Sequence, residues 1–294
     1  GHLNNCEFGY STIKKIIQNL SNSNIDIIEI GFLEDCIYDK NKTRFNYVYE
    51  ANNLLSKIDL KNSIISLLVQ VDKYDINKLE NCDGYVKMIR VSFHKEYLNK
   101  AIKYCKLVKK KGYICSLNPI NFSGYNNLEI IELIKKVNEI DIDYFSIVDT
   151  FGSMMENDLL RIYSLVEHNL DKAIKIGLHL HENLGLSYSL AQRFIGMKSS
   201  ERECVIDASL CGMGRVPGNL NIELMMDYMN RFQGGYYNLS PVYDAINDYI
   251  EDLKSIEAWG YSTAYALSAK YNLHRNYSEY LLSKGKLRAK DINF

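Results

Sequence analysis

The sequence predicts an α/β fold, a (β/α)8 barrel whose first strand lies upstream of Gly1 or is absent from the 294 residues. Short runs rich in Ile and Val alternate with longer amphipathic segments, and the runs are almost continuously apolar, as expected for parallel strands buried on both faces. The chain opens on a helical pattern, whereas such a barrel begins with a strand. An open doubly wound sheet is the alternative, but no first strand carries a dinucleotide-binding glycine pattern.

The predicted elements alternate along the chain. Seven strands are expected at Ile25–Gly31, Ser63–Val69, Tyr85–Ser92, Tyr113–Pro119, Asp143–Asp149, Lys175–His181 and Glu203–Ser209. Helical periodicity is seen at about Ser11–Ser21, Arg44–Lys57, Tyr74–Glu80, Lys95–Lys111, Asn126–Glu139, Met154–Asn169, Ser187–Met197 and Asn219–Arg231. Gln233-Gly234-Gly235 marks a boundary. We therefore expect a barrel domain over residues 1–233 and a helical extension, 234–294, packed on it.

Composition excludes several classes of protein. Hydrophobic residues make up 47%, charged residues 24%, and the net charge is -1, which does not favour nucleic-acid or membrane-surface binding. No apolar run approaches the roughly 18 to 20 residues that cross a bilayer, and no signal peptide is seen. The seven cysteines form no CxxC pair and are expected to be reduced thiols. We expect a cytoplasmic protein.

Two histidines one residue apart carry the strongest chemical signal. His179 and His181 stand at the end of a predicted strand, where alternation points both side chains to one face. Two imidazoles on one face can bind one divalent metal. At the carboxyl end of a barrel strand, that face is where such enzymes place their chemistry. The alternative is a pair of histidines that are only hydrogen-bonded.

Several motifs together resemble one family of barrel enzymes. They are Glu29-Ile-Gly31, Ile89-Arg90-Val91 with His94, Val148–Met154, His179–Leu186 and Asp207–Asn219. In these motifs the chain resembles the DRE-TIM metallolyases (the HMG-CoA lyase-like barrels), and within them the 4-hydroxy-2-oxovalerate aldolases. Family members hold a third metal ligand, an Asp, in an Arg-Asp-Gly motif at the end of strand one. This sequence lacks that motif, and Gly1-His2 matches the residues that follow it.

The resemblance implies roles for individual residues. His179 and His181 would be metal ligands, and Asn219 would complete the metal shell, although it could instead cap the eighth helix. His2 matches a general base, or is a terminal remnant. Tyr261 is a candidate acid, or a packed aromatic residue. HMG-CoA lyases carry a catalytic Cys where this chain has Met213, which argues against HMG-CoA cleavage.

Four further residues end predicted strands. Arg90 is a candidate catalytic cation that could pair with a substrate carboxylate, and His94 and Asn118 could contact the substrate. Asp149 is a substrate-site candidate that could hold Arg90 or a ligand histidine, or cap the next helix. Glu29 is expected to be a buried carboxylate paired with a barrel arginine.

The resemblance implies a divalent-metal aldolase or lyase that cleaves or forms a C–C bond next to a pyruvate-type enolate. The substrates would be a 4-hydroxy-2-oxo acid, or a 2-oxo acid and an aldehyde, and Mn²⁺ or Mg²⁺, or else Zn²⁺ or Co²⁺, would be the cofactor. An acyl-CoA-dependent Claisen condensing enzyme is one alternative. A non-catalytic partner-binding barrel is another. The C-terminal helices could mediate a homo-oligomer or bind an aldehyde dehydrogenase-like partner.

Overall fold

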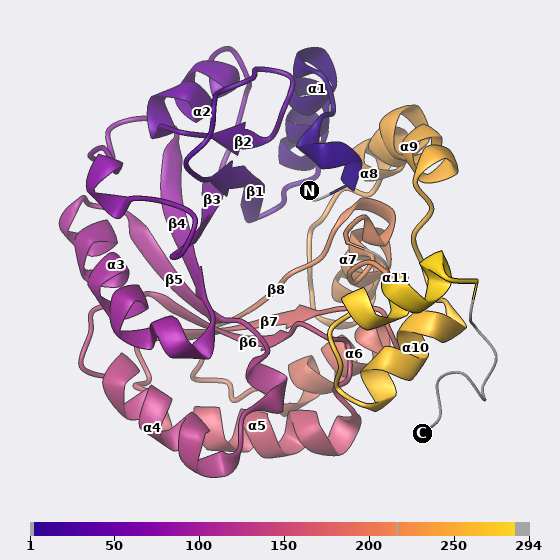
Figure 1. Cartoon of the computed structure of the whole chain (residues 1–294). Coiled ribbons are helices and arrows are strands. Elements are labelled where there is room, and N and C mark those ends of the chain that lie inside the picture. The colour runs from indigo at the N-terminus through magenta and orange to yellow at the C-terminus, as the bar shows by residue number, and fades with distance from the viewer. Residues whose placement is uncertain (1–2, 216, 286–294) are drawn as a thin grey trace.

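The computed structural model describes residues 3–215 and 217–285. Eight parallel strands form one sheet in the order β2-β1-β3-β4-β5-β6-β7-β8, and helices surround it in a ring (Figure 1). The strands are β1 Ile27–Leu33, β2 Arg44–Phe45, β3 Ile64–Gln70, β4 Val86–Phe93, β5 Ile114–Pro119, β6 Tyr144–Asp149, β7 Lys175–Leu180 and β8 Cys204–Ile206. The predicted α/β barrel fold is confirmed.

Seven helices belong to the barrel and four to the C-terminal extension within this part of the chain. The barrel helices are α1 Tyr10–Asn22, α2 Val48–Leu55, α3 Leu98–Lys110, α4 Asn127–Val137, α5 Glu156–Asn169, α6 Ser187–Met197 and α7 Ile222–Phe232. The extension holds α8 Ser240–Ala245, α9 Glu251–Ile256, α10 Thr263–Lys270 and α11 Asn276–Ser283. None of these described helices is long and apolar enough to span a bilayer.

All seven predicted strands are present, and the differences lie in short elements. The pattern at residues 74–80 forms only a 3-10 turn, Ile76–Lys78. The strand β2 was not predicted, because two residues make no apolar run. It pairs only with the last residues of β1, Phe32 and Leu33. Among the described residues no strand pairs with β8 on the side away from β7, so the sheet does not close between β8 and β1.

The strands are apolar because helices cover their outer faces and side chains fill the interior. All six residues of β6 are buried, as are the last five of β5. One continuous core cluster links the strands to the inward faces of the helices from α1 to α7. This rigid ring holds the carboxyl ends of the strands at one rim, where the candidate site lies.

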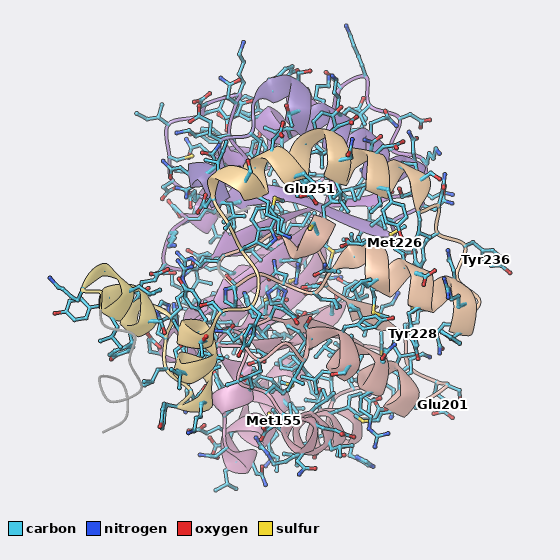
Figure 2. All side chains as sticks on the ribbon, turned by 90° about the vertical axis from the view of Figure 1, so that its right-hand side faces the viewer. Met155, Glu201, Met226, Tyr228, Tyr236 and Glu251 are labelled. Atoms are coloured by element: carbon cyan, nitrogen blue, oxygen red, sulfur yellow. The ribbon has the colours of Figure 1, made fainter. Side chains whose placement is uncertain are left out.

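The extension packs on the barrel through a second apolar cluster. Met226 of α7 is 3% exposed and contacts this cluster, which also contains Val242, Ile250 and Trp259. Figure 2 labels Met226, with Glu251 marking the start of α9. The Trp259 Nε1 donates to the backbone oxygen of Cys211 at 2.8 Å. These contacts fix the start of the extension beside the loop that precedes α7.

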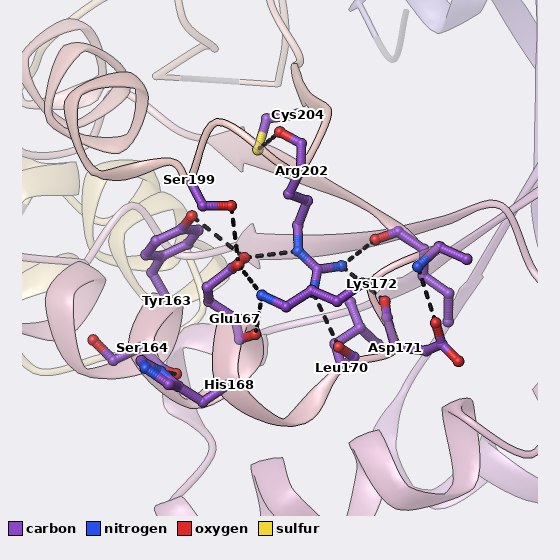
Figure 3. A network of polar contacts seen from close by, with 12 residues as sticks. Tyr163, Ser164, Glu167, His168, Leu170, Asp171, Lys172, Ser199, Arg202 and Cys204 are labelled. Carbon is purple, nitrogen blue, oxygen red and sulfur yellow. Dashed lines mark hydrogen bonds and ion pairs between the residues drawn. The ribbon is translucent and has the colours of Figure 1, made fainter.

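The buried Arg202 links several residues at the end of the barrel opposite the candidate site (Figure 3). The Arg202 guanidinium donates to the backbone oxygens of Leu170, Asp171 and Ile174, which follow α5 and precede β7. Its Nε lies 2.7 Å from the Glu167 carboxylate, which also binds Lys172. Because the network satisfies carbonyl groups at a helix end, its role is structural.

Candidate active site

A cavity of about 1630 Å³ runs into the barrel from the carboxyl ends of the strands. At this rim it is lined by His94, Asn118, His179, His181 and Asn219. It extends along the gap between β1 and β8, where no described strand fills the sheet. The structure therefore brings together five of the nine predicted site residues at one mouth, and Arg90 also lines the cavity.

The two histidines present their rings side by side, with ring centroids 5.0 Å apart and planes at 77°. The Nδ1 of His179 lies 3.0 Å from the Asp207 carboxylate, and that of His181 lies 2.9 Å from the backbone oxygen of Asp149. A neutral imidazole that donates through Nδ1 keeps the Nε2 lone pair for a metal. Burial lowers the pKa of His181 to about 3, with His179 adding to the effect, so its ring is neutral at pH 7.

Arg90 is held inside the barrel by two carboxylates. Its guanidinium binds Glu29 at 2.9 Å and also binds Asp207, and it donates to the Asn118 Oδ1 at 3.3 Å. Burial opposes the charge on Arg90, but Asp207 and Glu29 outweigh it and raise its pKa. Burial works against the Asp207 carboxylate, yet Arg90 and His179 lower its pKa to about 2. The predicted pairing of Glu29 with a barrel arginine is confirmed, but the prediction that this carboxylate is buried is wrong, because its side chain is 33% exposed.

This cluster changes the predicted role of Arg90. Asp207 and Glu29 compensate the charge of Arg90, so Arg90 is not a free cation for a substrate carboxylate. It positions Asp207 instead, and Asp207 orients His179. Asn118 likewise supports Arg90 through its side-chain oxygen. The sequence analysis gave Asp207 no role. The available signal was its place just beyond a strand that neighbours the one carrying His179.

Asp149 contacts a candidate ligand histidine, His181, which is one of the alternatives predicted for it, but it does so through its backbone oxygen and its carboxylate does not pair with Arg90. Its carboxylate accepts from the Ser123 hydroxyl and from the backbone N–H groups of Ser153 and Met154. Burial raises the pKa of Asp149 to about 6, while these hydrogen bonds limit the rise. The side chain thus shapes the loop after β6, whereas the oxygen that orients His181 belongs to the last residue of the strand itself.

Asn219 lies against the second histidine. Its backbone bridges to His181, and its Nδ2 donates to the Met213 backbone oxygen at 3.0 Å. Gly214 leaves room for this side chain, because a Cβ at that position would lie 2.3 Å from the Asn219 Nδ2. The alternative role of Asn219 as a helix cap is wrong, since Asn221 occupies the position before α7.

Three predicted site residues lie outside this arrangement or at its edge. His2 lies outside the described residues. Tyr261 is 63% exposed in the linker between α9 and α10, and the extension reaches the cavity instead through His274 and Arg275. The prediction of Tyr261 as an acid in the cavity is therefore not supported by its placement. His94 is exposed at the cavity rim after β4.

The donor atoms present fit part of a divalent-metal site. His179 and His181 supply two imidazoles whose outer nitrogens are already held, and the Asn219 side-chain oxygen is a third candidate donor. Across residues 3–215 and 217–285, no group of three or more His, Cys, Asp and Glu side chains has the spacing of a metal site.

Comparison with known proteins agrees with this geometry. The model of the HMGL-like family matches residues 2–247, which include every strand of the barrel. A crystal structure of the N-terminal domain of a putative aldolase from Bacteroides vulgatus has the same fold. It superposes with a TM-score of 0.80 at 21% identity, covering 94% of this chain and 91% of that one.

Curated relatives match less of the sequence. A 4-hydroxy-2-oxovalerate aldolase from Geobacillus genomosp. 3 is 22% identical over 232 residues, which cover 76% of this chain and 65% of the relative. A homocitrate synthase from Pyrococcus horikoshii is 28% identical over 150 residues, 51% of this chain and 39% of the relative. The chain thus spans less than two thirds of the length of these relatives.

Proposed function

The chain belongs to the HMGL-like family, and from this premise we propose that it is a divalent-metal-dependent C–C lyase acting on a 4-hydroxy-2-oxo acid. The observation that carries the proposal is the paired orientation of His179 and His181, each fixed through Nδ1 by a separate partner. Both histidines line the same cavity, and in each ring Nδ1 is the nitrogen that is already hydrogen-bonded, which leaves Nε2 for a ligand. Metal-ligating histidines are held in this way.

In this proposal His179, His181 and Asn219 hold Mn²⁺ or Mg²⁺. A bound cation of this kind withdraws electron density from a 2-oxo acid and stabilises the enolate that develops. Arg90 and Asp207 keep His179 in its orientation and screen each other's charge. The neutral state of His181 keeps its ring available at pH 7.

The reaction itself breaks the bond between C3 and C4 of the substrate. A base removes the proton of the C4 hydroxyl, the C4–O bond becomes a carbonyl, and the bonding electron pair moves to C3 as an enolate. Protonation at C3 then releases pyruvate and an aldehyde. His2 remains the proposed base, on the resemblance alone. Tyr261, the predicted acid, does not line the cavity, so we assign no residue to the protonation of C3.

The test is pyruvate release from 4-hydroxy-2-oxopentanoate with Mn²⁺ or Mg²⁺, measured with a coupled lactate dehydrogenase assay. We expect His179→Gln and His181→Gln to lose both activity and Mn²⁺ binding. His168→Gln is the matched control, since His168 lies exposed on α5 and bonds only its own helix. Mn²⁺ binding that survives both cavity substitutions would overturn the metal assignment. Absence of turnover with either metal would overturn the reaction.

The homocitrate synthase match favours a second candidate, an acyl-CoA-dependent condensing enzyme. The same inner site would then stabilise an enolate of the acyl thioester while it attacks a 2-oxo acid. Hydrolysis of the resulting thioester by water then releases free CoA, which a thiol reagent detects. CoA release with acetyl-CoA and a 2-oxo acid, without pyruvate formation from hydroxy-oxo acids, would favour this candidate over the aldolase.

A further inference from the structure

Three basic side chains from two distant segments meet at the outer part of the cavity. Arg215 belongs to the glycine-rich loop before α7, whereas His274 and Arg275 form the turn between α10 and α11. All three line the same cavity as His179 and His181. None of the three was singled out by the sequence patterns. They lie together because the extension folds back to the rim of the barrel (Figure 1).

The turn that carries His274 is fixed to the barrel. The Ser153 hydroxyl donates to the Asn272 side-chain oxygen at 3.0 Å, and the His274 ring packs edge-on against Phe151, with centroids 5.6 Å apart. The backbone N–H of Asn276 donates to the His274 Nδ1 at 3.2 Å. Because Nδ1 accepts, the neutral ring carries its proton on Nε2, and His274 is a hydrogen-bond donor.

The charges at this mouth are unbalanced. Arg275 forms an ion pair with Glu279 at 3.2 Å, whereas Arg215 is exposed and has no ion pair among the described residues. Burial and the Arg215 charge both lower the pKa of Arg275, and burial, Arg215 and Arg275 lower that of His274. Two guanidinium groups that repel each other across a cavity are stabilised when an anion binds between them.

The carboxylates named below do not take the place of that anion, because they pair with other cations or lie on another side of the rim. Lys95 pairs with Glu129, whose carboxylate also accepts from the backbone N–H of Asn126 at the start of α4, so these two charges compensate each other. Glu96 lines the cavity in the exposed turn Lys95–Tyr97, on the β4 side. The carboxylates deeper in the barrel, Glu29 and Asp207, are bound to Arg90.

We propose that Arg215, His274 and Arg275 form an anion subsite, and that the substrate carries a second anionic group at the end away from its 2-oxo acid. This proposal rests on the proposed function, because it takes the histidine pair as the site of the 2-oxo acid. The second group is a carboxylate or a phosphate ester, both of which suit bidentate arginine and a neutral imidazole donor. The enzyme would then prefer a 4-hydroxy-2-oxo dicarboxylate or a phosphorylated 4-hydroxy-2-oxo acid over a homologue without the second anionic group.

The first arm of the test compares substrates. The value of kcat/KM is measured with Mn²⁺ for 4-hydroxy-2-oxopentanoate, 4-hydroxy-2-oxoadipate and a 6-phosphorylated 4-hydroxy-2-oxohexanoate. We expect Arg215→Gln to lower kcat/KM about 10- to 100-fold for the preferred substrate with a second anionic group, with little change for 4-hydroxy-2-oxopentanoate. The same pattern is expected for His274→Ala. Arg193→Gln is the matched control, because Arg193 forms an ion pair with Glu156 on the outside of the barrel.

The second arm measures binding without turnover. Succinate and inorganic phosphate are titrated calorimetrically into the wild type, Arg215→Gln and Arg193→Gln, and the stronger probe identifies the class of anion. Loss of binding in Arg215→Gln alone supports the subsite even if no substrate turns over, in which case only the proposed reaction fails. Equal binding in all three proteins, or an equal loss of kcat/KM on substrates with and without the second anionic group, overturns the subsite.

Discussion

The substitution Asp207→Asn tests the carboxylate that joins Arg90 to the histidine pair. The Asp207 pKa is lowered from 3.8 to about 2, chiefly by Arg90 and then by His179, which outweigh burial. At 1.36 kcal/mol per pKa unit, this shift corresponds to about 2 kcal/mol of unfolding free energy at pH 7. Asn also leaves Arg90 with Glu29 as its remaining carboxylate, so the loss is expected to reach about 2 to 4 kcal/mol.

The pH dependence identifies the cause. A carboxylate whose pKa is lowered in the folded state stabilises the protein above its ordinary pKa and loses this contribution as the pH falls through the folded value. The difference between the wild type and Asp207→Asn should therefore be full at pH 7 and shrink between about pH 4 and pH 2, as urea unfolding followed by circular dichroism would record. Asp227→Asn, which breaks an exposed pair with Arg231, should cost less than about 1 kcal/mol. A loss at Asp207 equal to that of the control, or one independent of pH, would refute the reasoning.

Three other substitutions test separate parts of the fold and the site. Arg202→Met should lower the unfolding free energy by about 3 to 5 kcal/mol in urea titrations, because it leaves a buried carboxylate without its guanidinium partner, whereas the affinity for Mn²⁺ should not change. Gly31→Ala should lower the melting temperature, since its φ is +152° and a Cβ would lie 2.1 Å from the Thr43 backbone oxygen; Gly196→Ala, with open space around it, should not. Asn219→Ala should weaken Mn²⁺ binding about 10- to 100-fold in calorimetry, and unchanged affinity would remove Asn219 from the ligand set.

The strands were predictable because their signal is local. A strand such as β6, buried on both faces, is mostly apolar, and its apolar residues Tyr144, Phe145, Ile147 and Val148 leave a nearly continuous run in the sequence. The pairing of His179 with His181 followed from the same alternation along one strand. The two-residue strand β2 left no such run, so it could not be found from the pattern.

The rest of the site depends on contacts between distant segments. Asp207 meets Arg90 only because β8 follows β7 around the sheet, so the pair joins residues that are 117 positions apart in the chain. Nothing in the local pattern around Asp149 shows that its carboxylate turns toward Ser123 while its backbone oxygen receives His181. His274 and Arg275 lie between two short helices, α10 and α11, whose hydrophobic periodicity is weak. They line the cavity because the extension folds back to the rim of the barrel.

The two arginines at the mouth also have a consequence for the inner site. Arg215 and Arg275 both act on His181, where they add to the lowering of its pKa. The same positive field that disfavours a proton on His181 also disfavours a divalent cation beside it. An anion bound between the arginines cancels this field, so metal and anion should each strengthen the binding of the other by the same factor. We expect succinate to tighten Mn²⁺ binding several-fold in the wild type, and Arg215→Gln to bind Mn²⁺ more tightly without succinate yet gain little when it is added. An equal effect of succinate on both proteins would mean that it contacts the metal alone, and the two subsites would then be independent.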